Sequence, residues 1–219
     1  MAPKTNARRF ILSLGLILLV VATLLPHPVS ARTLNEASLP DLNAFALAVQ
    51  NGEANTLRGV YAENIFALPV LQQPTYNAAF VSRDPNSVTQ FSLASQFGNV
   101  GLLAHNDLSG QYFFQLYQGE RIQLVYGDGR IEYFRVTGIY RYQAESPFST
   151  KSNFTDLDTR EYLTAYDLFA KVYKGPRHIT FQTCIANNGN SSWGRLFVIA
   201  EPEKSLPQLA AQIQEQIQT

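Results

Sequence analysis

The chain has 219 residues, with 17 basic and 17 acidic side chains, 46% hydrophobic residues and a single cysteine. The balanced charge argues against a general nucleic-acid binder, which needs a surplus of lysine and arginine facing phosphates. One cysteine excludes an internal disulfide and the usual cysteine-based zinc sites. The hydrophobic fraction and the low charged fraction of 16% indicate a folded globular chain, and the length suits one domain or one domain plus a targeting segment.

The N-terminus has the pattern of a secretory signal. Three basic residues within the first nine precede an uncharged apolar run over residues 10–25, and small residues follow up to Ala31. This order predicts a signal peptide cleaved after Ala31. The alternative is an uncleaved signal anchor, although the apolar run is shorter than the roughly 20 residues that a membrane span needs. In both cases we expect residues 32–219 to be extracytoplasmic at the cell surface, either secreted or associated with the membrane through residues 10–25.

The exported part begins with a predicted helical lead-in over residues 32–55. Ser38 is a suitable N-cap for a helix that runs to Val49, because Ser, Thr, Asp and Asn accept hydrogen bonds from the first free N–H groups. Apolar residues recur on one face of this helix, and Gly52 ends it.

Short strands follow in quick succession. They are predicted over residues 58–65, 70–71, 99–104, 121–126 and 130–142. The last two flank Gly127-Asp128-Gly129, which is a strong hairpin turn.

A second helix is predicted over residues 159–173 and is closed by Gly175-Pro176. Two more strands over residues 178–184 and 195–200 are separated by a polar loop, and the tail has the apolar spacing of an amphipathic helix. Many short strands with turn signals between them predict a barrel or a sandwich. The predicted organisation is a signal or anchor (1–31), the lead-in (32–55), one β-rich domain (56–203) and a C-terminal helix (204–219).

The single cysteine, Cys184, is predicted at the end of a strand. Alternation sends the apolar residues Ile179 and Phe181 to the core face, so Cys184 faces the other side, where the polar loop begins. A free cysteine in an exported protein is unusual, since this compartment favours disulfides. It can be a buried small hydrophobe, a point of intermolecular linkage or a reactive group.

Two further residues are candidates for chemistry because they lie at strand ends. His105 follows the apolar run 99–104 just before a polar turn, and Arg195 opens the last strand directly after Trp193-Gly194. Taken alone, each is compatible with a solvated residue at a strand end. His178, beside Pro176, is interpreted as structural.

Three short motifs around these residues resemble one known family. The segment Thr180-Phe-Gln-Thr-Cys184 resembles the TLxTC signature of sortases, the cysteine transpeptidases that attach proteins to bacterial cell walls. The run Leu102-Leu-Ala-His-Asn106 is similar to the segment that carries their histidine. Trp193-Gly-Arg195-Leu-Phe-Val198 is similar to the segment that carries their arginine, and the order of the three motifs also matches.

The resemblance covers residues 56–201 and implies a mainly β fold. Specifically, it implies a closed β-barrel of about eight strands with short peripheral helices. The helix predicted over residues 159–173 is then expected to border the substrate groove. Two positions depart from the family pattern: Phe181 replaces the usual leucine, and Ala104 stands where the family often has glycine. Neither change removes a catalytic group.

The resemblance also implies roles for five residues. Cys184 is expected to attack a peptide carbonyl, and His105 to act as general acid and then as general base. Arg195 is expected to hold the substrate or to stabilise the oxyanion. Asn106 and Thr183 are expected as substrate-binding residues, with Thr183 forming the groove wall beside the nucleophile.

The implied activity is transpeptidation at the cell surface. The expected partners are the sorting-signal peptide of an exported protein and an amine nucleophile. No P-loop or dinucleotide-binding glycine pattern is present, so we expect no cofactor and no metal. Two alternatives remain. One is a thiol peptidase of another family, although papain-like enzymes have cysteine before histidine. The other is an exported β-barrel binding or adhesion module in which Cys184 is buried and inert.

Overall fold

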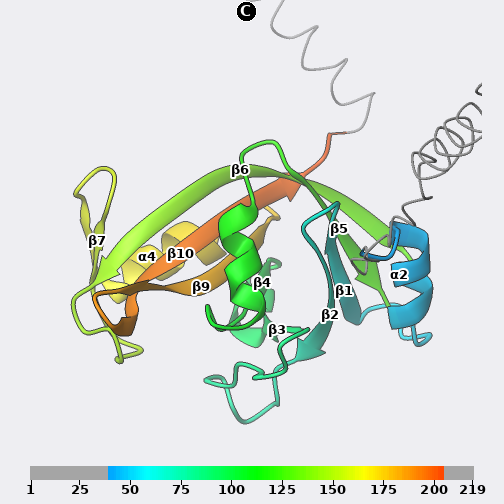
Figure 1. The fold of residues 1–219 in the computed structure, drawn as a ribbon, viewed down its shortest axis with the longest axis horizontal. Coiled ribbons are helices and arrows are strands. Elements are labelled where there is room, and N and C mark those ends of the chain that lie inside the picture. The colour runs from blue at the N-terminus through cyan, green and yellow to red at the C-terminus, as the bar shows by residue number, and fades with distance from the viewer. Residues whose placement is uncertain (1–38, 205–219) are drawn as a thin grey trace, which may run out of the picture. The chain divides into compact units, whose positions relative to one another are not determined.

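The strands form one sheet that closes on itself. The structure, a computed structural model, describes residues 39–204. Within these residues the strand order is β10-β9-β4-β3-β2-β1-β5-β6, and β6 also pairs with β10, so eight strands form a closed barrel (Figure 1). A closed barrel has no free edge that could pair with another chain. The expected mainly β fold with a closed barrel is confirmed.

The elements follow the chain with short connections. The barrel strands are β1 (Leu57–Ala62), β2 (Phe66–Gln72), β3 (Val88–Phe91), β4 (Val100–Leu103), β5 (Arg121–Tyr126), β6 (Ile131–Ala144), β9 (Ile179–Asn187) and β10 (Asn190–Pro202). Two short strands, β7 (Phe154–Asp156) and β8 (Tyr162–Leu163), continue the sheet outward from β6. The helices are α2 (Leu42–Val49), α3 (Ser92–Ser95), the 3-10 helix η2 (Ser109–Gln115) and α4 (Ala165–Tyr173).

The barrel interior is the main hydrophobic core. Fully buried side chains from most of the barrel strands meet there, among them Val60, Val88, Leu102, Leu124, Phe181 and Val198. Helix η2 adds Phe113, whose ring centroid lies 5.1 Å from that of Phe181. Burial of one such side chain contributes about 1.5–3 kcal/mol to the stability of the fold, so contacts of this kind hold the inner face of β9 in the core.

Helix α2 begins at Leu42 and not at the predicted Ser38, which lies outside the described residues. Asp41 is the N-cap, and its Oδ1 accepts a hydrogen bond from the Ala44 N–H at 2.9 Å. The physical reason is Pro40, because a residue that precedes proline is disfavoured in helical conformation. The predicted apolar face is correct, since Phe45 and Ala46 are buried against the outside of the barrel.

Helix α4 is shorter than the predicted helix over residues 159–173. The first five residues belong to the turn after β7 and to β8, where Arg160 has a φ of +68° that an α-helix does not accept. Asp156 holds this turn by accepting hydrogen bonds from the N–H groups of Asp158 and Thr159. Thr164 then caps α4 by accepting from the Asp167 N–H.

Two hairpins replace predicted loops or breaks. The predicted strands over residues 58–65 and 70–71 are the hairpin β1–β2, whose turn contains Asn64 at a φ of +61°. The predicted loop over residues 185–194 is wrong, since β9 and β10 extend through it to a two-residue turn. Its residues Asn188 and Gly189 both have positive φ, which is the requirement of a type I′ turn. The hairpin predicted around residues 127–129 is confirmed.

The predicted signal or anchor (1–31) lies outside the described residues, and so does nearly all of the predicted C-terminal helix. No helix within residues 39–204 is long and apolar enough to cross a membrane. The predicted domain boundaries stay predictions.

Candidate functional site

The ends of β4 and β9 lie next to each other because these two strands are parallel. Leu103 pairs with Gln182 in the register, and the Ala104 N–H donates to the Gln182 carbonyl at 3.2 Å. His105 follows Leu103 by two residues, and Cys184 follows Gln182 by two residues. The register therefore brings the end of β4, two residues before His105, beside the part of β9 that leads to Cys184.

Arg195 reaches this place from the opposite side of β9. It is the direct cross-strand partner of Cys184 in the antiparallel pair β9–β10. Directly opposed residues project on the same face of a sheet. Three residues that lie far apart in the sequence, His105, Cys184 and Arg195, are thus contributed by three neighbouring segments of the barrel wall.

Cys184 is half-buried and lies within β9, which continues to Asn187 beyond the predicted strand end. Its Sγ lies 3.7 Å from the hydroxyl oxygen of Ser192, which follows the turn of the same hairpin. The nucleophile candidate is therefore held on regular sheet and not at the edge of a loop.

The guanidinium of Arg195 connects the start of β10 to the loop between β6 and β7. Its Nη1 donates to the carbonyl oxygens of Ser192 (2.9 Å) and Gly194 (2.8 Å). Its Nη2 donates to the carbonyl oxygen of Pro147 at 2.9 Å, in the loop between β6 and β7. A guanidinium has five N–H donors in a fixed plane, so three such bonds fix its orientation and leave two donors for a ligand.

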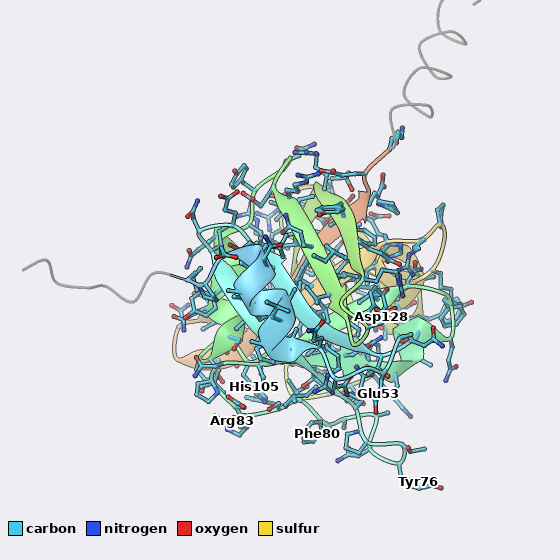
Figure 2. The ribbon with its side chains drawn as sticks, turned by 90° about the vertical axis from the view of Figure 1, so that its right-hand side faces the viewer. Glu53, Tyr76, Phe80, Arg83, His105 and Asp128 are labelled. Atoms are coloured by element: carbon cyan, nitrogen blue, oxygen red, sulfur yellow. The ribbon has the colours of Figure 1, made fainter. Side chains whose placement is uncertain are left out.

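His105 is half-buried at the start of the turn into η2, and its position is marked in Figure 2. Its main-chain carbonyl accepts from the N–H groups of Leu108 (3.0 Å) and Gly110 (2.9 Å). Gly110 packs so closely that an added Cβ would lie 2.6 Å from the His105 carbonyl oxygen. A glycine at this position therefore fixes the histidine-bearing turn against β9.

Asn106 and Thr183, the two predicted substrate-binding residues, lie in different surroundings. Asn106 is half-buried, and its Nδ2 donates to the carbonyl oxygen of Ser191 at 3.0 Å, which joins the histidine turn to the β9–β10 hairpin. Thr183 is only 2% exposed and packs against Gly110 inside the barrel wall. This differs from the expected groove wall, because alternation along β9 points residue 183 away from the face of Cys184.

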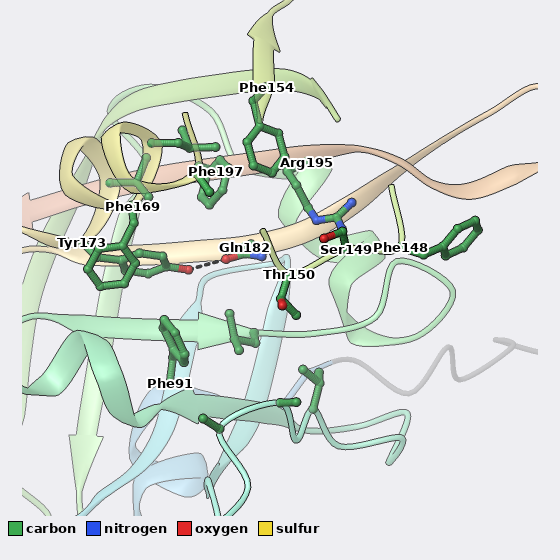
Figure 3. Close-up of a pocket in the computed structure, with 17 residues that line it drawn as sticks. Phe91, Phe148, Ser149, Thr150, Phe154, Phe169, Tyr173, Gln182, Arg195 and Phe197 are labelled. Carbon is green, nitrogen blue, oxygen red and sulfur yellow. Dashed lines mark hydrogen bonds between the residues drawn. The ribbon is translucent and has the colours of Figure 1, made fainter. Parts of the chain in front are cut away.

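A groove of about 320 Å³ runs along the outer face of the barrel and reaches Arg195 (Figure 3). Its floor comes from β4, β9 and β10, one side from α4, and the other side from the loop between β2 and β3. Most of its lining is apolar and includes Phe91, Leu103, Phe154, Leu168, Phe169, Val172, Tyr173 and Phe197. As expected, α4 borders the groove.

One polar pair interrupts this apolar floor. Tyr173 donates its hydroxyl hydrogen to Oε1 of Gln182, as the dashed line in Figure 3 marks. Complete burial raises the pKa of Tyr173 far above its ordinary value, so the phenol stays a protonated donor. Gln182 and Cys184 share one face of β9, which places the pair two residues from the sulfur.

His178 has the structural role that the sequence indicated. It is 7% exposed, and its two ring nitrogens lie 2.7 Å from the Pro176 carbonyl oxygen and 2.9 Å from that of Val172. Within residues 39–204, no group of three His, Cys, Asp or Glu side chains could hold a metal ion.

Sequence reasoning missed Ser192 and the arginine-bound loop at Pro147. The Asn188-Gly189 pair is a signal that could have found Ser192, because Asn-Gly between two strands predicts a tight hairpin that folds residues 190–193 back onto β9. No comparable signal marks Pro147, which lies 48 residues before Arg195.

The described residues form a β-barrel protein with an apolar groove on its outer face, and Arg195, the cross-strand partner of Cys184, lines this groove. No protein-family model and no curated protein sequence matches the chain.

Solved structures of sortases are similar to it. Sortase C from Clostridium perfringens SM101 is 16% identical, with 70% of this chain and 72% of that chain covered and a TM-score of 0.42. A sortase from Actinomyces oris is 15% identical over 70% and 83% of the two chains, with a TM-score of 0.44. Sortase E1 from Streptomyces coelicolor is 17% identical, with 71% of this chain and 91% of that chain covered and a TM-score of 0.43.

Proposed function

We propose that the chain is an extracytoplasmic cysteine transpeptidase of the sortase type. It cleaves the C-terminal sorting signal of an exported protein and transfers the resulting acyl group to an amine at the cell surface. The observation that carries this proposal is the direct opposition of Arg195 and Cys184 across β9–β10, with His105 two residues beyond the end of β4, the parallel neighbour of β9.

The reaction has two halves. The Cys184 thiolate attacks the carbonyl carbon of the scissile peptide bond, because the thiolate and not the thiol is the nucleophile. The carbon–nitrogen bond then breaks, His105 gives a proton to the leaving amine, and a thioester remains. An incoming amine attacks the thioester and loses its proton to His105, and the thiolate is restored as the new amide bond forms.

Arg195 stabilises the charge that develops on the carbonyl oxygen. Its two remaining N–H donors can point to that oxygen while the other three hold the guanidinium in place. A donor that is already oriented needs no reorganisation during the reaction, which is the basis of oxyanion stabilisation.

The groove supports an extended peptide as substrate. A large apolar side chain of the peptide can be buried against the aromatic and aliphatic lining of the groove. This burial contributes about 25 cal/mol of binding free energy for each Å² of apolar surface that leaves water. We propose that Asn106, at the rim between the histidine turn and the hairpin, contacts the peptide near the scissile bond.

The test is turnover of a fluorogenic peptide library by the purified chain, with and without amine acceptors. We expect Cys184→Ala and Arg195→Ala each to abolish cleavage, and Arg141→Ala, an exposed arginine of β6 paired with Asp158, to retain it. Added amine should convert the product from the acid to the amide. Turnover like that of the unmodified chain in Cys184→Ala would exclude the proposal.

The alternative, a binding module with an inert buried cysteine, makes a different prediction for the thiol. Cys184 is half-buried, so a small alkylating reagent should modify it in the folded chain. A thiol that reacts only after unfolding would favour the alternative.

A further inference from the structure

The β9–β10 hairpin contains an irregularity directly beside Cys184. The register pairs Asn190 with Asn187 and then resumes at Gly194 with Ile185, so residues 191–193 face a single residue of β9. Such a bulge turns side chains away from their regular alternation, and bulges are frequent next to active sites. Ser192 lies in the middle of this bulge, with its hydroxyl oxygen 3.7 Å from the Cys184 sulfur.

Hydrogen bonds on several sides fix the bulge. The Ser192 N–H donates to Oδ1 of Asn190 at 2.9 Å, and the Ser192 carbonyl accepts from Nη1 of Arg195 at 2.9 Å. The carbonyl of the preceding residue, Ser191, accepts from Asn106 at 3.0 Å. The turn, the arginine and the residue after the histidine therefore all hold the backbone that carries the Ser192 hydroxyl.

We infer that Ser192 is a positioning residue for the nucleophile, an inference that rests on the proposed function. A hydroxyl can donate to or accept from a thiol, but toward a thiolate it can only donate. A hydrogen bond to an ionised partner is about twice as strong as one between neutral groups. Ser192 therefore stabilises the negative charge on the sulfur and holds the sulfur toward the scissile carbonyl.

The same residue also links the nucleophile to Arg195. The Ser192 hydroxyl contacts the sulfur while its carbonyl oxygen binds the guanidinium, so one residue sets the distance between attacking atom and oxyanion donor. The two contacts can be separated by mutation. Alanine retains the carbonyl that binds Arg195 and removes only the hydroxyl.

The experiment compares Ser192→Ala with Ser191→Ala in the full chain. Ser191 is the exposed neighbour, and its carbonyl oxygen, which alanine retains, accepts the hydrogen bond from Asn106. The first measurement is the rate at which iodoacetamide alkylates Cys184 at neutral pH, which needs no peptide substrate. Because Cys184 is the only cysteine in the chain, mass spectrometry reports this one site.

We expect Ser192→Ala to lower the alkylation rate about three- to tenfold, the range that one hydrogen bond supports. The kcat for the sorting-signal peptide should fall by a similar factor with an unchanged KM. Ser192→Thr, which keeps a hydroxyl, should restore most of both rates, and Ser191→Ala should leave both unchanged. Ser192→Gly replaces Ser192→Ala if alanine disturbs the bulge, as thermal unfolding would reveal.

Alkylation of Ser192→Ala at the rate of the unmodified chain overturns the inference. A faster rate also overturns it, because the hydroxyl would then mask the sulfur. If the unmodified chain cleaves no peptide while Ser192→Ala is alkylated more slowly, the proposed function fails and the contact between Ser192 and the sulfur stands.

Discussion

Thr183 and Cys184 are adjacent in β9 but point to opposite sides of the barrel wall. The Thr183 hydroxyl is buried and has no hydrogen-bond partner within the described residues. A buried polar group without a partner costs about 1–3 kcal/mol, so a valine would be the more stabilising residue of the same shape. The Thr183 hydroxyl lies against Gly110, in the turn that carries His105, so under the proposed function we expect it to position that turn.

We therefore expect Thr183→Val to raise the free energy of unfolding by about 1 kcal/mol while it lowers peptide turnover. Urea denaturation and kcat/KM measure the two effects. Thr180→Val is a matched control on the same strand, because the Thr180 hydroxyl donates to the Val172 carbonyl and its loss should destabilise the chain. A loss of stability in both variants would show that Thr183 has a partner in solution.

Alternation and strand ends in the sequence indicate Cys184 and Arg195 as candidates, and the register does oppose them. Asn188-Gly189 could have indicated that residues 190–193 fold back onto β9, but not that the Ser192 hydroxyl reaches the sulfur, because a bulge places it there and a bulge has no simple sequence pattern. The contact of Arg195 with Pro147 depends on where a distant loop folds.

The sequence predicts helices and strands correctly where interactions between residues close in the sequence determine them. Regular alternation gave the strands, and Gly127-Asp128-Gly129 gave the correct hairpin. Errors arose where two signals compete. Asn, Gly and Ser over residues 185–194 suggest a loop, yet these residues belong to a hairpin with a two-residue turn at Asn188-Gly189 and a bulge over residues 191–193. Helical spacing over 159–173 continues past a residue, Arg160, whose positive φ excludes it from the helix.

The β9–β10 turn gives a prediction for this element. Gly189 has a φ of +80°, and a left-handed conformation costs about 1–2 kcal/mol for a residue with a Cβ. We expect Gly189→Ala to destabilise the chain by about that amount and to lower peptide turnover, because the turn supports the bulge that carries Ser192. Asn187→Ala, at the other side of the turn, is the control.

Urea denaturation and peptide turnover are measured for both variants. An unfolding midpoint of Gly189→Ala equal to that of the unmodified chain would show that the turn has another conformation. Reduced turnover in Asn187→Ala as well would assign the effect to the exposed surface of the hairpin and not to its backbone.

The whole molecule depends on long-range closure of the barrel. Strand β6 pairs with β5 along its first half and with β10 along most of its length (Figure 1). Alternation in the sequence predicts that these strands exist but not that β6 pairs with β10, because this pairing joins residues more than 50 positions apart. The closed barrel was therefore expected from the resemblance of motifs, and periodicity alone left a sandwich open.

Ion pairs reinforce the closure at one end of the barrel. Glu203, directly after β10, binds Arg121 of β5 at 2.7 Å and Arg135 of β6 at 2.6 Å. Burial alone would raise the pKa of Glu203, but the hydrogen bond and charge of Arg121, with those of Arg135, lower it below the ordinary value of 4.5. The carboxylate is thus more acidic in the folded chain than in the unfolded chain.

This difference makes stability depend on pH in a defined window. At neutral pH both states are ionised, and the pairs of Glu203 contribute in full. Below about 4.5 the unfolded chain takes up the proton first, so this contribution is lost as the pH falls through the folded pKa. We expect the urea midpoint of Glu203→Gln to fall less steeply than that of the unmodified chain between pH 5 and 3, a window set by the carboxyl pKa.

Glu201→Gln, two residues earlier on the exposed end of β10, removes the same charge and leaves the two ion pairs intact. Its midpoints should follow those of the unmodified chain across the pH series. Glu203→Gln should also be less stable at pH 7, because a neutral amide keeps the shape of the carboxylate but not its attraction to two arginines. Equal pH profiles for Glu203→Gln and the unmodified chain would show that solvent screens the two ion pairs of Glu203. Backbone pairing alone would then close the barrel.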